Sequence, residues 1–190
     1  MRCDAQRNRE RLIEVASDAF AEHGVDASLE KIARAAGVGI GTLYRHFATR
    51  DALLEAVYRH NVEQLCASAD ELLATLPPDE ALGQWMQSFV GYVAVKRGLA
   101  SYLKSVVAAD SDLFTYAHGL VRATVSRLIA AAVDAGAIRE GVDGMDVLHA
   151  LSGVCLMSDQ SGDPEQGAKV AALLMDGLRY GAAAPAGATR

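Results

Sequence analysis

The apolar residues of this 190-residue chain recur at spacings of three and four positions from one end to the other. This spacing marks one face of an α-helix, which has about 3.6 residues per turn. No stretch alternates apolar and polar residues between turn signals, as a half-exposed strand does. We therefore predict an all-α fold with about nine helices. The expected helices cover about residues 5–23, 29–36, a brief stretch ending at 47, 50–72, 79–96, 99–108, 112–135, 144–157 and 164–181.

Residues with short polar side chains mark the starts of several of these helices. Ser28 and Thr49 can cap the second and the fourth helix, because their hydroxyls can accept hydrogen bonds from the first free amides. The segment SDQSGDPEQ is the most loop-like part of the chain. Within it, Asp163 and Pro164 are suited to be the N-cap and first residue of the last helix.

The distribution of charge bears on the class of partner. A formal charge of −6 argues against a protein that coats nucleic acid without sequence preference. Residues 1–60 carry equal numbers of basic and acidic side chains, so the whole negative charge lies in residues 61–190. The N-terminal third therefore repels an anionic partner less than the rest of the chain does.

The sequence offers no signal for a membrane, a secretory route or a metal. No apolar run approaches the ~20 residues of a membrane span, and the charged N-terminus lacks the apolar core of a signal peptide, so we expect a cytoplasmic protein. Cys3, Cys66 and Cys155 are odd in number and far apart, which argues against disulfides and zinc. Pairs such as His60 and Glu63 supply at most two metal ligands. We expect no metal and no cofactor.

The glycine-rich segment GVGIGTLYRHF, residues 37–47, could be a phosphate-binding loop or the turn of a helix pair. A dinucleotide-binding loop needs a third glycine where this chain has Thr42 or Tyr44, and it needs a preceding strand. A nucleoside-triphosphate loop needs a Gly-Lys pair, which the chain lacks. Spacing and context both exclude the nucleotide-binding interpretation.

A helix-turn-helix over residues 28–47 fits the same segment. Such a motif has an amphipathic helix, a short turn and a second helix that enters the major groove. Gly37 permits the turn, and Leu43 and Phe47 lie four positions apart on the inward face. The remaining positions offer hydroxyl and nitrogen donors suited to phosphate, or a bare backbone that a duplex can approach closely. The residues expected to point outward or toward the helix ends are Gly39, Thr42, Tyr44, Arg45 and His46.

The pattern GVxxGTLYxHF, followed by a basic residue and ALL, resembles the TetR family of bacterial transcriptional regulators. The resemblance covers residues 9–60 and is strongest in DAFAEHGVDASLEKIARAAGVGIGTLYRHFATRDALLEAVY. It departs from the family at Gly39, where a capping Ser or Thr is frequent.

The resemblance also implies roles for individual residues. Ser28 corresponds to a phosphate contact, and Arg50 to a basic residue of the fourth helix that flanks the groove. Ile40 and Arg45 occupy variable positions, which we expect to touch base edges. Thr42, Tyr44 and His46 correspond to a clamp on the DNA backbone. The complete set of expected DNA contacts is Ser28, Lys31, Gly39, Ile40, Gly41, Thr42, Tyr44, Arg45, His46 and Arg50.

The resemblance implies a three-helix DNA-binding domain over residues 1–50. A larger helical domain for ligand binding and dimerisation would follow over 51–183, with a disordered tail at 184–190. The segments AGAIREGVD and LLMDGLRYG are faintly similar to the SbtR-like subgroup. Two apolar stripes on the last two helices could pair with their two-fold mates in a four-helix bundle. These stripes are Leu148, Leu151 and Cys155, and Val170, Ala171, Leu174 and Leu178.

Candidate effector contacts lie on the middle helices, where ordinary core packing is the simpler explanation for each residue. The polar members His118, Arg122 and His149 stand out because they lie within or beside apolar stripes, and a buried polar group needs a partner. The full set is Trp85, Phe89, Tyr92, Tyr102, Phe114, His118, Arg122, His149 and Met157.

These observations predict a ligand-responsive homodimeric repressor. It would bind a palindromic double-stranded DNA operator with its recognition helices about 34–36 Å apart, and release it when a small molecule binds. One alternative is a helical dimeric adaptor without DNA binding. Another is a small all-α enzyme with His118 or His149 as general base, but no partner residue stands at a suitable spacing. We therefore expect no enzymatic activity.

Overall fold

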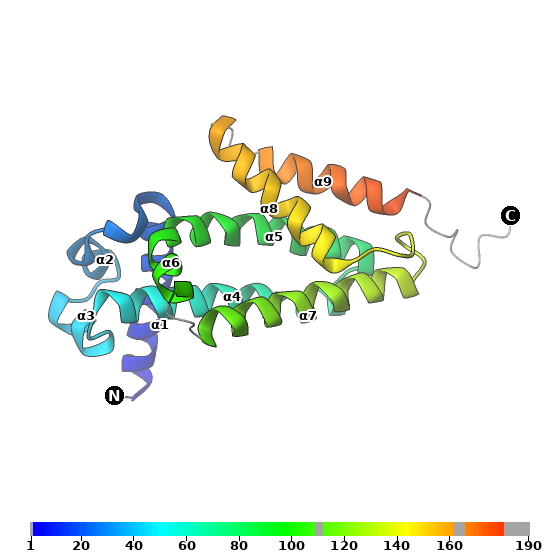
Figure 1. The fold of residues 1–190 in the computed structure, drawn as a ribbon. Coiled ribbons are helices and arrows are strands. Elements are labelled where there is room, and N and C mark those ends of the chain that lie inside the picture. Colours follow the sequence, from blue (N-terminus) through cyan, green and yellow to red (C-terminus); the bar gives the residue numbers. More distant parts are fainter. Residues whose placement is uncertain (1, 109–111, 162–165, 181–190) are drawn as a thin grey trace, which may run out of the picture. The chain divides into compact units, whose positions relative to one another are not determined.

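The computed structural model describes residues 2–108, 112–161 and 166–180. Within these ranges it contains nine α-helices, one 3-10 helix and no strand, which confirms the all-α prediction (Figure 1). The predicted helix start at Asp163 and Pro164 and the predicted tail 184–190 lie outside the described residues. The elements in chain order are α1 (Arg2–His23), η1 (Gly24–Asp26), α2 (Leu29–Ala35), α3 (Ile40–His46), α4 (Arg50–Thr75), α5 (Pro78–Gly98), α6 (Ala100–Ala108), α7 (Asp112–Asp134), α8 (Gly144–Ser161) and α9 (Gln166–Arg179).

Helices α4 and α8 extend further past their predicted C-terminal ends than the other helices do, and both continue toward the next strong helix breaker. Helix α4 reaches Thr75, and prolines follow at positions 77 and 78. Helix α8 continues through the first half of SDQSGDPEQ to Ser161. Polar residues alone do not end a helix, whereas a proline usually does, because it lacks the amide hydrogen and clashes with the preceding turn. In the described parts of the chain, no helix combines the length and the apolar character needed to cross a membrane.

The chain packs as two compact units. Unit 1 comprises Met1–Glu63 and Ala94–Ala117, and unit 2 comprises Gln64–Val93 and His118–Arg190. The borders fall inside α4, α5 and α7, so each of these helices contributes residues to both units. The domain boundaries 1–50, 51–183 and 184–190 stay a prediction.

The core of unit 1 is formed by the apolar stripes expected from the helical spacing. Helix α2 packs on α1 and α3, and burial of each large side chain contributes about 1.5–3 kcal/mol. A polar contact joins α1 to α4, because the Asn61 amide donates to the Ser17 hydroxyl at 3.0 Å and to the Val57 carbonyl at 2.8 Å. The buried core residues of these four helices include Leu12, Ala16, Phe20, Leu29, Ile32, Ala33, Leu43, Leu53, Leu54 and Val57.

Gly98, the last residue of α5, lies directly against the C-terminal end of α1. A Cβ atom at this position would overlap the Phe20 carbonyl group and lie 3.1 Å from the Cα of Ala21. Helix α6 begins two residues later and contacts η1. Unit 1 therefore depends on an approach between two backbones that only glycine permits.

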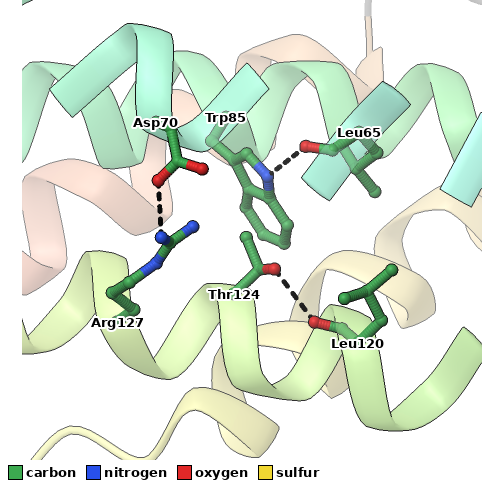
Figure 2. Close-up of polar contacts among 6 residues, drawn as sticks. All are labelled: Leu65, Asp70, Trp85, Leu120, Thr124 and Arg127. Carbon is green, nitrogen blue, oxygen red and sulfur yellow. Dashed lines mark hydrogen bonds and ion pairs between the residues drawn. The ribbon is translucent and has the colours of Figure 1, made fainter. Parts of the chain in front are cut away.

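Unit 2 is centred on Trp85, whose side chain is fully buried (Figure 2). Its indole Nε1–H donates to the Leu65 carbonyl at 2.8 Å, so burial leaves this polar atom paired. Nearby, the Thr124 hydroxyl donates to the Leu120 carbonyl at 2.9 Å, and the Arg127 guanidinium pairs with Asp70 (Figure 2). The Trp85 hydrogen bond ties α5 to α4, the Thr124 hydrogen bond lies within α7, and the ion pair ties α4 to α7.

Helices α8 and α9 pack against each other in unit 2 (Figure 1). The Arg139 amide donates to the Leu178 carbonyl at 2.9 Å, which joins the α7–α8 connection to the end of α9. Arg179 Nε donates to Asp79 Oδ2 at 2.8 Å and so links α9 to α5. Packing against α8, a backbone hydrogen bond and an ion pair therefore hold α9 in unit 2.

Candidate nucleic-acid interface

Helix α2 begins at the predicted cap. The Ser28 hydroxyl oxygen accepts from the Lys31 amide at 3.3 Å, and the hydroxyl donates to Glu30 Oε2 at 2.9 Å. The backbone amide of Glu30 and the Ser28 hydroxyl together hold the pKa of the Glu30 carboxyl below its usual value. The Ser28 proton is thus donated to a carboxylate within the chain.

Three backbone features make the turn between α2 and α3. Gly37 has φ of 74°, a left-handed conformation that glycine adopts without strain. Its amide donates to the Arg34 carbonyl, and the Val38 amide donates to the Ala33 carbonyl, each at 3.0 Å. This pair of bonds is a Schellman motif, which ends a helix and reverses the chain. The predicted helix-turn-helix geometry is present.

Helix α3 has seven residues and is held by two inward side chains. Leu43 is fully buried, and Phe47 at the C-cap is almost fully buried. Gly39 occupies the N-cap position without a side-chain hydrogen bond, and its carbonyl accepts from the amides of Thr42 and Leu43. A Cβ atom at Gly39 or Gly41 would meet no other atom within 4 Å. Packing within the chain therefore does not require glycine at either position.

The outward face of α3 carries large side chains exposed to solvent. Ile40 and Tyr44 are 36% and 48% exposed, and Gly41 and Arg45 are exposed as well. Thr42 and His46 flank this face and are half-buried; Lys31 on α2 is exposed. The solvent-facing side of α3 therefore presents one apolar side chain, one phenol ring and one guanidinium group.

Arg50, the basic residue expected to flank the DNA groove, lies at the first position of α4. In the structure its Nη1 donates to the carbonyls of Val25 and Ala27, each at 2.7 Å. These two carbonyls belong to the connection between α1 and α2. The guanidinium therefore stabilises the position of α2 from within unit 1.

The structure adds one residue to this region that sequence reasoning missed. The Arg9 guanidinium lies over the ring of Phe47, with its Cζ 5.3 Å from the ring centroid. This contact joins α1 to the end of α3. No local sequence signal could have paired these two residues, because the contact arises only when the helices pack.

Comparison with known proteins matches two separate ranges of the chain to known protein families. Residues 12–57 match the family model described as bacterial regulatory proteins of the tetR family. Residues 77–180 match the C-terminal domain of SbtR-like transcriptional regulators. The crystal structure of the TetR transcriptional regulator SCO0520 from Streptomyces coelicolor is 43% identical, with 90% of this chain and 98% of that chain covered and a TM-score of 0.81.

The chain belongs to the TetR family. A second solved TetR regulator, from Mycobacterium vanbaalenii, is 36% identical over 94% of this chain and 98% of that one, with a TM-score of 0.73. An HTH-type transcriptional regulator of Staphylococcus aureus (strain USA300) is 42% identical over 64 residues. That match spans 33% of this chain and 35% of the relative, so it covers only about a third of either protein.

Substituting Arg50 tests its structural role in this TetR-family chain. We expect Arg50→Ala to lower the free energy of unfolding by about 2 kcal/mol, because two carbonyls lose a charged donor. Chemical denaturation followed by circular dichroism measures this change. The matched control is Arg45→Ala, which removes an exposed arginine from α3 and should alter stability by less than about 0.5 kcal/mol. Equal effects of the two substitutions would contradict the role assigned to Arg50.

The predicted effector contacts are distributed over both units. Trp85, Phe89 and Tyr92 form a buried aromatic row in unit 2, with successive ring centroids 5.8 and 5.6 Å apart. Tyr102 and Phe114 are half-buried in unit 1. The side chain of Met157 lies outside the described side chains. Packing of the three rings against one another explains why Trp85, Phe89 and Tyr92 are buried without any ligand. The effector contacts therefore stay a prediction.

The argument from buried polar groups does not apply to the three polar members of the set. His118, Arg122 and His149 are exposed, not buried among apolar residues. On α7 the buried side chains include Val121 and Val125, and a residue one position away points about 100° around the helix. The three residues therefore lie beside the apolar stripes and stay predicted contacts only.

Two surface clefts in the described residues contain none of the predicted effector contacts. One, of about 240 Å³, lies in unit 1 between α1 and α4 and includes Arg9 and His60. The other, of about 400 Å³, lies in unit 2 between α5 and α9 and includes Gln84 and Met175. Within the described side chains, no three His, Cys, Asp or Glu residues gather as metal ligands do.

Proposed function

We propose that this protein is a homodimeric DNA-binding repressor that releases a palindromic double-stranded operator when a small molecule binds within residues 51–183. The observation that carries the DNA-binding part is the outward face of α3. It presents exposed Ile40, Tyr44 and Arg45 around a backbone left bare at Gly41, while Leu43 holds the helix on unit 1.

The chemistry of this face suits the major groove. Arg45 points away from the buried side of α3 and can donate two hydrogen bonds to a guanine edge, while Ile40 can contact a thymine methyl group. Tyr44, Thr42 and His46 provide donors for phosphate oxygens on either side. Without a Cβ, Gly41 lets the duplex approach the helix backbone. We expect Arg45 and Ile40 to determine which DNA sequence is preferred. Tyr44, Thr42 and His46 should determine how the protein is positioned on the duplex.

The proposed dimer surface differs from the one expected from sequence. Leu148, Leu151 and Leu178 are buried within the single chain, so they are not available to a second copy. The exposed large apolar side chains in this region are Leu173 on α9 and Tyr180, which directly follows α9; they are 69% and 84% exposed. They lie seven positions apart, and the Tyr180 amide still donates to the Asp176 carbonyl at 3.0 Å, so the two side chains lie on about the same side of the helix. This face is the better candidate for pairing with a second chain.

A charge placed on this face tests the dimer. We expect Leu173→Glu to shift the protein from dimer to monomer, because two copies of a buried carboxylate would face each other across the two-fold axis. Light scattering coupled to size-exclusion chromatography measures the mass. As a control, Ala123→Glu places the same charge on an exposed position of α7 and should leave the mass unchanged. A Leu173→Glu protein that stays dimeric would exclude this face.

Release of the operator requires two conformational states of the protein for which the effector has different affinities. A small molecule shifts the equilibrium only if it binds one state more tightly than the other. In the DNA-binding state the two α3 helices must lie about 34–36 Å apart to enter successive major grooves. We propose that the effector favours a state with a different spacing.

Footprinting of the purified protein on DNA from around its own gene tests the proposal. The expected result is one protected palindrome, with affinity that falls steeply as salt concentration rises. A dimer that protects no site at moderate salt would contradict DNA binding and would favour the adaptor alternative. Membership of a family of regulators gives no support to the enzyme alternative.

A further inference from the structure

Lys96 in the last turn of α5 has an unusual environment for a lysine. Its side chain is only partly accessible to solvent. The ammonium lies over the ring of Phe114 on α7, with Nζ 5.6 Å from the ring centroid. Both residues belong to unit 1. A lysine at a helix end usually extends its ammonium into water, where hydration stabilises the charge.

No carboxylate compensates this charge in the described part of the chain. The neighbours of Lys96 at helical spacing are Tyr92, Val93, Leu99 and Ala100, and none is acidic. None of the described ion pairs includes Lys96, whereas Arg59 pairs with Glu55 and Arg127 with Asp70. Burial lowers the pKa of the Lys96 ammonium below its usual value. The aromatic ring is the one favourable contact that the described residues provide.

Two structural explanations account for only part of this arrangement. A cation near a helix C-terminus is favourable by about 0.3–1 kcal/mol when it is exposed, but Arg97 already supplies a charge in the same turn. A cation over an aromatic ring gains about 0.5–2 kcal/mol. Partial burial of an unpaired ammonium costs free energy. Neither the favourable charge at the helix end nor the contact with the ring requires the ammonium to be buried. A methionine would fill the same volume without this cost.

We propose that Lys96 is the anchor of the effector site and that the effector is an organic carboxylate. This inference rests on the proposed ligand-responsive function and names the chemical class of its ligand. The carboxylate pairs with the ammonium on the side away from the Phe114 ring. The ion pair compensates the charge that the free protein leaves unpaired.

Another titratable group of unit 1, Tyr102, has carboxylates close to it, unlike Lys96. Burial raises the pKa of Tyr102 on α6, and the carboxylates of Glu55 and Asp51 raise it further. The carboxylates of Glu55 and Asp51 raise the pKa of Tyr102, whereas burial alone lowers the pKa of Lys96. Lys96 is thus available to an anion that enters from outside.

The experiment uses the full-length protein, with benzoate and hexanoate as probes and benzamide and hexanamide as uncharged counterparts. We expect at least one carboxylate to raise the melting temperature in a saturable way, by about 5 °C or more at about 100 times its Kd. The corresponding amide should have no effect. The variant Lys96→Met should lose the response, and Lys104→Met, which removes an exposed lysine on α6, should retain it.

A second measurement needs no ligand. Without added carboxylate, Lys96→Met should melt at a higher temperature than the unmodified protein, because an unpaired charge is removed from a partly buried position. A lower melting temperature would show that the ammonium has a stabilising partner and would overturn the proposal. So would the absence of any response to both carboxylates, an equal response to the amides, or an unchanged response in Lys96→Met.

Operator binding measured in parallel separates this proposal from the proposed function. A protein that binds its operator but responds to neither carboxylate would refute the anion site alone. A protein that responds through Lys96 but protects no DNA would refute the repressor function while leaving the anion site intact. If both proposals hold, the stabilising carboxylate also releases the DNA from the unmodified protein and not from Lys96→Met.

Discussion

Replacing Gly98 with alanine is expected to lower the free energy of unfolding by about 3 kcal/mol. The added Cβ would overlap the carbonyl group of Phe20, which belongs to the backbone of α1 and cannot rotate away as a side chain would. Either α5 or the end of α1 must move. Because stabilities of single domains are about 5–15 kcal/mol, this loss is a large fraction of the total. Urea denaturation measures it directly.

The control for this substitution lies on the same helix. An added Cβ at Gly91 would meet no atom within 4 Å. Gly91→Ala should therefore stabilise the protein by about 0.5–1 kcal/mol, because alanine loses less backbone entropy in a helix. If Gly98→Ala were as stable as the unmodified protein, the close approach of α5 to α1 would be refuted.

The second large effect concerns DNA binding. We expect Tyr44→Ala and Arg45→Ala each to weaken operator binding by about 10- to 100-fold, which corresponds to about 1–3 kcal/mol for a lost contact to a base or the backbone. Both side chains are exposed on α3, so neither substitution should lower the melting temperature appreciably. Fluorescence anisotropy with a labelled operator measures the affinity.

The two substitutions should differ in how they affect specificity. Arg45→Ala should relax the preference at one base pair, whereas Tyr44→Ala should weaken all sequences about equally. Tyr116→Ala and Arg122→Ala remove an exposed tyrosine and an exposed arginine from α7 and serve as matched controls. If the controls weakened DNA binding as strongly, the effect would be one of overall charge and not of the α3 face.

Local signals in the sequence were sufficient to predict much of the fold. Ser28 caps α2 and Thr49 caps α4 through hydrogen bonds to amides three residues ahead. Gly37 forms the turn before α3. Each of these interactions closes within a few residues, so the types and spacing of neighbouring residues are enough to identify it. Helical periodicity predicted the buried face of α3 for the same reason.

Contacts between distant segments were not indicated by local signals. Arg50 was expected to flank the DNA groove, and the structure shows that it also donates to carbonyls more than twenty positions away. His118, Arg122 and His149 lie beside apolar stripes but are exposed. A periodic pattern shows which face of a helix is apolar, but it does not show how far the buried region extends around that helix.

The sequence by itself determined the all-α class, the helix-turn-helix and the residues that α3 turns outward, because these follow from backbone geometry over one or two helical turns. Only the tertiary structure decided that Gly98 must lack a side chain, that Arg9 covers Phe47, and that Lys96 lies partly buried over Phe114. In each case the deciding atom belongs to a segment far away in the chain. Its proximity results from the packing of whole helices, which no short stretch of sequence encodes.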